Sequence, residues 1–180
     1  SVYGSASASY RSWAFLTVTG RNDWSSTLPT ANNSYFYPSV TASVLLDQAL
    51  GFNSNNVNYF KLRGGWSQVG SDADPYQLAT VYTSEAAFNG DPLQTSSKQG
   101  LNANLKPERT SSYEVGLEGA FFGNRLHFDA ALYQTDSRDQ ILRLATTAAS
   151  GYTSQIRNAG HIRNRGFELF VGGTPVIAGK

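Results

Sequence analysis

Apolar and polar residues alternate with a period of two along most of this 180-residue chain, and the period of 3.6 that marks helices is almost absent. Such alternation is typical of β-strands with one apolar and one polar face. The polar positions carry mainly Ser, Thr, Gly and Asn with isolated charges. We therefore predict an all-β, antiparallel fold with seven strands, over residues 4–9, 14–23, 39–44, 60–67, 112–118, 126–133 with an extension to about 145, and 155–174.

The composition excludes several classes of protein. Lys and Arg number 14 against 13 Asp and Glu, and a net charge of +1 gives no electrostatic basis for binding nucleic acid. The absence of Cys excludes disulfides, zinc knuckles and a thiol nucleophile. No run approaches the roughly 18 apolar residues of a transmembrane helix, but a transmembrane barrel stays open. Charged residues make up 15% of the chain, below the roughly 25% of a typical soluble domain.

The predicted connections differ in length between the two ends of the strands. Residues 10–13 and 121–125 form tight turns, the second with Gly123-Asn124 as its turn residues. Residues 25–37 form a longer connection, 47–58 an intermediate one and 70–109 a very long one. Outer-membrane barrels have short periplasmic turns and long extracellular loops. We therefore predict an up-and-down transmembrane β-barrel segment with residues 70–109 on the extracellular side.

The two faces would meet different surroundings in such a barrel. Four alternate apolar positions span about 25 Å at roughly 3.3 Å per residue, which is the height of a lipid-facing band. We expect lipid to contact Leu16, Val18, Val40, Val44, Leu62, Val115, Leu117, Phe128, Leu132, Phe167 and Leu169. We expect a hydrated lumen to contact Arg21, Asp23, Lys61, Arg63, Glu114, Glu118, Asp129 and Glu168, with Lys61 and Arg63 across from Glu114 and Glu118. Aromatic residues near strand ends suit the two membrane interfaces, namely Tyr10, Trp13, Trp24, Tyr37, Tyr59, Trp66 and Tyr113.

Several motifs follow one another in a fixed order along nearly the whole chain. Residues 21–26 read R-x-D-x-S-S and residues 35–40 read Y-F-x-P-S-V. Residues 62–70 are LRGGWSQVG, 105–108 are LKPE and 113–118 are YEVGLE. Gly151-Tyr152 precedes residues 158–168, which read N-x-G-x-I-x-N-x-G-F-E. In this order the motifs resemble the C-terminal barrel region of the SusC/RagA family of TonB-linked outer-membrane proteins.

The resemblance implies a 22-stranded barrel in the bacterial outer membrane. Family members are plugged by an N-terminal domain, work with a SusD-like surface lipoprotein and are energised by TonB to import oligosaccharides or peptides. We expect residues 1–180 to be part of the barrel domain, with the plug, the TonB box and the N-terminal regions outside this chain. An odd number of strands also indicates a part of a larger barrel.

The sequence predicts no enzyme, no cofactor and no metal site. It contains no G-x-S-x-G, H-E-x-x-H, P-loop or G-x-G-x-x-G motif. Asp72, Asp74 and Glu85 lack the spacing of a Ca²⁺ loop, and His127 and His161 are two lone histidines. Rings in long loops stack on sugars and peptides, so the expected substrate-binding residues are Tyr35, Phe36, Tyr76, Tyr82 and Phe88.

Two alternatives stay open from the sequence. A small, closed outer-membrane barrel would have a structural or adhesive role and needs an even number of strands. A soluble carbohydrate-binding β-sandwich would pack its apolar face on a second sheet.

Overall fold

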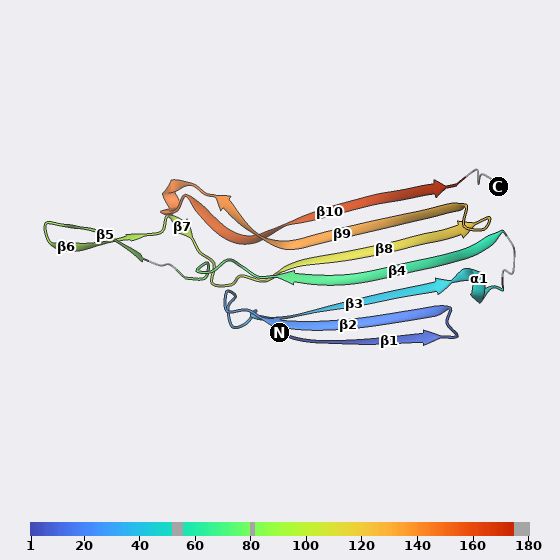
Figure 1. Ribbon diagram of the computed structural model, residues 1–180. Helices are drawn as coiled ribbons and strands as arrows, with labels where there is room; N and C mark the ends of the chain where they lie inside the picture. The colour runs from blue at the N-terminus through green and yellow to red at the C-terminus, as the bar shows by residue number, and fades with distance from the viewer. Residues whose placement is uncertain (52–55, 80–81, 175–180) are drawn as a thin grey trace.

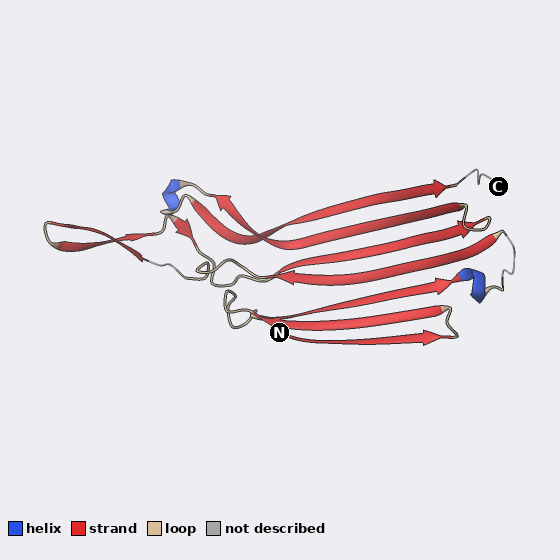
Figure 2. Ribbon diagram, in the orientation of Figure 1, coloured by secondary structure: helices blue, strands red, loops and turns tan. Residues whose placement is uncertain are grey.

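The computed structural model describes residues 1–51, 56–79 and 82–174. Its main element is one antiparallel sheet in which seven long strands lie side by side (Figure 1). Strand makes up most of the described chain (Figure 2). The seven long strands are β1 (Val2–Tyr10), β2 (Ala14–Trp24), β3 (Ser34–Leu45), β4 (Val57–Ser71), β8 (Glu108–Phe121), β9 (Leu126–Ala145) and β10 (Ser154–Gly173). The predicted seven-stranded antiparallel fold is confirmed.

The strand order is β1-β2-β3-β4-β8-β9-β10-β7, so each long strand pairs with the next long strand along the chain. The two-residue strand β7 (Gln99–Gly100) lies parallel to the start of β10 at the edge of the sheet. Residues opposite each other in such a meander share a face of the sheet. Val18 lies opposite Val40, Leu62 lies opposite Leu117, and Leu132 lies opposite Phe167. The alternation seen in the sequence therefore becomes two continuous faces, one apolar and one polar.

Short turns join the strands at one end of the sheet. Arg11 and Ser12 connect β1 to β2 with φ of 46° and 60°, and Gly123 and Asn124 lie in the β8–β9 turn with φ of 66° and 63°. Positive φ at successive residues matches the twist of the flanking strands in tight hairpins. The four-residue helix α1 (Leu46–Ala49) follows β3 at this end.

Longer connections lie at the opposite end of the sheet (Figure 1). The connection between β4 and β8 contains a hairpin of β5 (Tyr82–Phe88) and β6 (Asp91–Ser96), which projects away from the main sheet, and the two-residue strand β7 (Gln99–Gly100). The sequence did not predict these elements. The 3₁₀-helix η1 (Ala148–Ser150) lies between β9 and β10. None of the helices in the described residues is long and apolar enough to span a membrane.

A small core lies between the long connections and the ends of β3, β9 and β10. It contains the buried side chains of Leu28, Ala73, Leu105 and Ile156, and Leu105 is fully buried. By contrast, large apolar side chains of the main sheet are open: Leu132 and Phe167 are each 61% exposed. In the described residues no second sheet covers this apolar face, as a β-sandwich would require.

Candidate functional site

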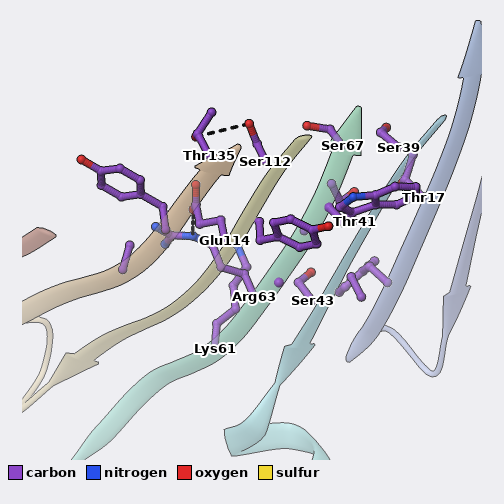
Figure 3. Close-up of a pocket in the computed structure, with 18 of the residues that line it drawn as sticks. Thr17, Ser39, Thr41, Ser43, Lys61, Arg63, Ser67, Ser112, Glu114 and Thr135 are labelled. Atoms are coloured by element: carbon purple, nitrogen blue, oxygen red, sulfur yellow. Dashed lines mark hydrogen bonds and ion pairs between the residues drawn. The ribbon is translucent and has the colours of Figure 1, made fainter. Parts of the chain in front are cut away.

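A hollow of about 650 Å³ lies on the polar face of the sheet. Residues from six neighbouring strands line it, from Thr17 on β2 to Glu168 on β10. Figure 3 shows Thr17, Arg63 and Thr135 among these residues. Seven of the nineteen lining residues carry small hydroxyl groups: Thr17, Ser39, Thr41, Ser43, Ser67, Ser112 and Thr135. Such a surface offers many hydrogen-bond donors and acceptors and few fixed charges.

The charged groups of the hollow form ion pairs between strands. Arg63 Nε lies 3.4 Å from Glu114 Oε1, and Lys61 Nζ lies 3.7 Å from Glu118 Oε2. These are the pairs of opposite charge that the sequence predicts between β4 and β8. Arg63 Nη1 also lies 3.0 Å from Asp129 Oδ2 on β9, a contact that the sequence did not reveal.

Glycines make room for large side chains on this face. The guanidinium of Arg63 lies over Gly116, where an added Cβ would come within 2.8 Å of Arg63 Nε. The ring of Tyr133 likewise occupies the space that a Cβ at Gly166 would need. The strand pattern gives no signal for these contacts, because they depend on which glycine lies opposite which long side chain.

Arg21 and Asp23 lie on the polar face at the end of β2 nearest the long loops. Arg21 Nε donates a hydrogen bond to Asp23 Oδ1 at 2.9 Å, and the Tyr37 hydroxyl donates to Asp23 Oδ2. Tyr37 therefore lies on the polar face, and Tyr59 does so too, because its hydroxyl donates to Glu118 Oε2. The expectation that these two rings lie at a membrane interface is wrong, since alternation directs them inward with the charged residues.

The opposite face carries all the residues for which the sequence predicts contact with lipid. They are Leu16, Val18, Val40, Val44, Leu62, Val115, Leu117, Phe128, Leu132, Phe167 and Leu169. At the short-turn end of this face, the rings of Phe60, Phe121 and Phe128 gather around Gly119 with centroids 5.8 to 6.4 Å apart. Towards the long loops, Trp66 lies opposite Tyr113. The apolar faces of β4 and β8 thus carry aromatic side chains near both ends of each strand.

Beyond the last apolar row, Asp136 on β9 lies buried within a polar cluster. Its carboxylate accepts hydrogen bonds from Arg163 Nε at 2.6 Å and Gln134 Nε2 at 2.5 Å, and pairs with His161 Nε2 at 2.8 Å. The hydrogen bond from Arg163, followed by that from His161, holds the pKa of the Asp136 carboxyl well below its usual range. Asp136 is therefore a structural anion, which argues against an acid–base role for it.

The five aromatic residues proposed for substrate binding lie in different surroundings. Tyr76, Tyr82 and Phe88 are exposed by 81%, 66% and 67%, the last two on the β5–β6 hairpin. Tyr35 packs against the small core and lies 5.7 Å from the Tyr37 ring, centroid to centroid. Phe36 lies opposite Asn22 and covers Gly20 on the face of the sheet away from the hollow.

The acidic and histidine residues considered for metal binding are dispersed. Asp72 Oδ2 accepts hydrogen bonds from Ser25 and Thr27, which joins the β2–β3 loop to the β4–β8 connection. His127 lies opposite Gly172 at the start of β9, and His161 lies opposite Arg138, eleven residues further along that strand. Within residues 1–51, 56–79 and 82–174, no three His, Asp or Glu side chains gather as a metal site would require.

The side chain of Asn158 on β10 binds backbone groups of the L-K-P-E segment, residues 105–108. Its Oδ1 accepts from the N–H of Lys106 at 2.9 Å, and its Nδ2 donates to the carbonyls of Lys106 and Asp139, each at 2.8 Å. Glu108 in the same segment accepts the N–H of Ile141. The sequence shows both motifs but does not reveal that they bind each other.

A meander with one apolar face, one polar face and edges that are open along β1 and along most of β10 defines a segment of a transmembrane β-barrel. The chain belongs to the TonB-dependent receptor-like β-barrel family, whose model matches residues 1–175. Members of this family are outer-membrane proteins of Gram-negative bacteria.

Curated relatives support the same assignment. TonB-dependent receptor P26 of Formosa agariphila is 30% identical over 98% of this chain and 18% of its own length. TonB-dependent receptor SusC of Bacteroides thetaiotaomicron is 24% identical, also over 98% of this chain and 18% of its own length. The chain therefore spans about a fifth of the length of these relatives.

Solved structures share the fold. The RagAB peptide importer in its closed-closed state superposes with a TM-score of 0.89 at 23% identity, over 98% of this chain and 20% of that chain. The siderophore receptor PirA of Pseudomonas aeruginosa gives 0.61 at 21% identity, over 93% and 29% of the two chains. The resemblance to SusC/RagA proteins found in the motifs is thus confirmed, as is the barrel segment.

Proposed function

We propose that this segment forms one wall of a TonB-dependent outer-membrane transporter that imports oligosaccharides or peptides together with a SusD-like lipoprotein. In this role the apolar face contacts lipid and the polar face lines a hydrated interior. The long connections, including the β5–β6 hairpin, lie on the extracellular side, where substrate and lipoprotein arrive.

The observation that carries this proposal is the separation of side chains between the two faces. Leu62 lies opposite Leu117 on one face, while Lys61 and Glu118 form an ion pair on the other. Exposed apolar groups need a hydrocarbon surrounding, and the hydroxyl-lined hollow with its ion pairs suits water. Within the described residues, β1 has no strand on its outer side and β10 has only the two-residue β7 on its outer side. Such a sheet is stable in a bilayer only within a closed barrel, because each unsatisfied backbone group costs several kcal/mol there.

The names of the relatives favour oligosaccharides or peptides as the substrate class and a SusD-like lipoprotein as the partner. One relative is named SusC, and one structural neighbour is described as a peptide importer. The exposed rings of Tyr76, Tyr82 and Phe88 supply flat apolar surfaces that stack on either sugars or peptides. The half-buried Tyr35 and the outward Phe36 are less available for that contact.

Single cysteines test the orientation of the sheet, because this segment contains no native Cys. In the complete barrel in lipid vesicles, a fluorophore on Leu132→Cys is expected to be quenched by nitroxide-labelled lipid. Thr135→Cys, on the hollow, is expected to react with a hydrophilic maleimide and to resist that quenching. The reverse pattern would reject the proposal.

Uptake measurements test the transport itself. Cells that carry the complete protein are expected to accumulate labelled oligosaccharide or peptide only when TonB and the SusD-like lipoprotein are present. Equal uptake without TonB would contradict an energised transporter, and equal uptake without the lipoprotein would contradict the proposed partnership.

A further inference from the structure

A row of two arginines and one histidine crosses β8, β9 and β10 on the same face as the apolar residues. Arg109 lies directly opposite Arg138, and Arg138 lies directly opposite His161. Like charges directly opposite each other on neighbouring strands destabilise a sheet. Neither Arg109 nor Arg138 forms an ion pair within the part of the chain that the structure describes.

Two further cations lie in the next two rows. Arg163 lies opposite Asp136, and Arg165 lies opposite Gln134, to which its Nε donates at 2.8 Å. We call the five residues Arg109, Arg138, His161, Arg163 and Arg165 the basic patch. All five are exposed, and in the rows of β8, β9 and β10 that carry them Asp136 is the single carboxylate. Four guanidinium groups therefore face one carboxylate.

The position of the basic patch relative to the apolar residues is fixed by register. On β8, β9 and β10 the row of Val115, Leu132 and Phe167 is the last apolar row, and Arg165 comes one row beyond it. Arg138 lies three rows beyond, which is about 20 Å further along β9 at roughly 3.3 Å per residue. If the apolar face contacts hydrocarbon, as the proposed function requires, the basic patch lies at the level of the outer-leaflet headgroups.

We propose that the basic patch binds the phosphate groups of lipopolysaccharide, the phosphorylated glycolipid of the outer leaflet. The planar guanidinium donates two parallel hydrogen bonds to a phosphate, and Arg109 and Arg138 have no protein carboxylate to occupy them. A phosphate between Arg109 and Arg138 also removes the repulsion that their alignment creates. Charge complementarity and height above the apolar rows both favour this occupant.

The test uses the complete barrel, purified in detergent and stripped of lipid. Binding of lipopolysaccharide is compared for the wild type, for Arg109→Gln/Arg138→Gln and for Arg11→Gln, a matched control in the turn at the opposite end of the sheet. The double variant is expected to bind at least tenfold more weakly, and the control is expected to bind as the wild type does. Equal binding by the double variant and the wild type would overturn the proposal.

A second measurement needs no variant and so does not depend on the folding of one. The wild type is expected to bind dephosphorylated lipopolysaccharide at least tenfold more weakly than the intact glycolipid, and binding of the intact form is expected to weaken as salt is raised. Equal binding of the two forms would overturn the proposal. Displacement of the glycolipid by equimolar inorganic phosphate would overturn it too, since the site would then serve a soluble anion.

This inference rests on the proposed orientation of the sheet, and the two can fail separately. Absence of lipid quenching at Leu132→Cys would reject the orientation. Quenching at Leu132→Cys together with undiminished binding by Arg109→Gln/Arg138→Gln would reject only the lipopolysaccharide site.

Discussion

Arg63 on β4 and Asp129 on β9 form an ion pair at 3.0 Å although the strand β8 lies between them. The side chain of Arg63 passes over Gly116, the residue of β8 that lies directly opposite it. Three strands are thereby connected by side chains as well as by backbone hydrogen bonds. The missing side chain of Gly116 is what opens this path.

Gly116→Val is expected to displace the Arg63 guanidinium and to reduce the free energy of unfolding by about 1 kcal/mol, because a partly exposed ion pair contributes roughly that much. Urea unfolding of the complete barrel in lipid vesicles measures the change. Gly4→Val is the matched control, since an added Cβ at Gly4 meets no atom within 4 Å. In an Asp129→Asn background the penalty at Gly116 should shrink, and an unchanged penalty would mean that the ion pair is not its cause.

Arginine on the apolar face is expected to cost more near its centre than at its edge. Leu117 lies in an inner row of the apolar face and Leu132 in the last apolar row before the polar cluster. Leu117→Arg should therefore reduce the free energy of unfolding by roughly 2–4 kcal/mol, and Leu132→Arg by only about 0–1 kcal/mol. The same unfolding experiment measures both, and equal penalties would contradict a bilayer boundary near Leu132.

The carboxylate of Asp136 should make stability depend on acid pH. Since hydrogen bonds from Arg163 and His161 lower its pKa in the folded state, the stabilisation is fully present above the unfolded pKa of about 4. It is lost progressively as the pH falls below that value towards the folded pKa. Melting temperatures of the wild type and Asp136→Asn should therefore differ most at neutral pH and begin to converge below about pH 4. A constant difference between pH 7 and pH 3 would contradict this linkage.

Asn158→Ala should release the L-K-P-E segment from β10. Three hydrogen bonds to backbone groups are lost, and a typical intramolecular hydrogen bond contributes about 0.5–1.5 kcal/mol to stability. Limited proteolysis near Lys106 should become several-fold faster, which gel electrophoresis and mass spectrometry detect. Asn104→Ala, an exposed position in the same connection, is the control and should leave the cleavage rate unchanged.

Replacing Tyr76 and Tyr82 together with Ala should weaken substrate binding by the complete transporter about tenfold, since stacking on two rings is lost. Equilibrium binding of labelled oligosaccharide or peptide measures this. Tyr3→Ala, which is as exposed as Tyr76 but lies on β1 of the main sheet, is the control. Unchanged affinity in the double variant would remove these rings from the binding surface.

The strands and the two faces were predictable because both depend on alternation within one segment. Leu16 and Thr17 belong to opposite faces whatever strand lies beside them, and the turn at Gly123-Asn124 has its own local signature. The family motifs added the order of the strands and the kind of barrel.

Contacts between distant strands were not predictable in the same way. The reach of Arg63 to Asp129 requires the register of three strands and a glycine at one position of the middle strand. The hydrogen bond from the Lys106 N–H to Asn158 depends on how the β4–β8 connection returns to the sheet. The hairpin of β5 and β6 was also missed, because its residues 82–96 lie within a connection that was treated as a loop.

The small core beneath the long connections holds the segments of the β4–β8 connection that lie on either side of the β5–β6 hairpin. Leu78 packs against this core on one side of the β5–β6 hairpin and Leu101 on the other, and the N–H of Asn102 donates to the carbonyl of Gln77. The segments on the two sides of the hairpin are therefore held to each other and to the core. A partner that binds the tip of the hairpin would therefore contact an element whose flanking segments are joined, through this core, to the end of the main sheet.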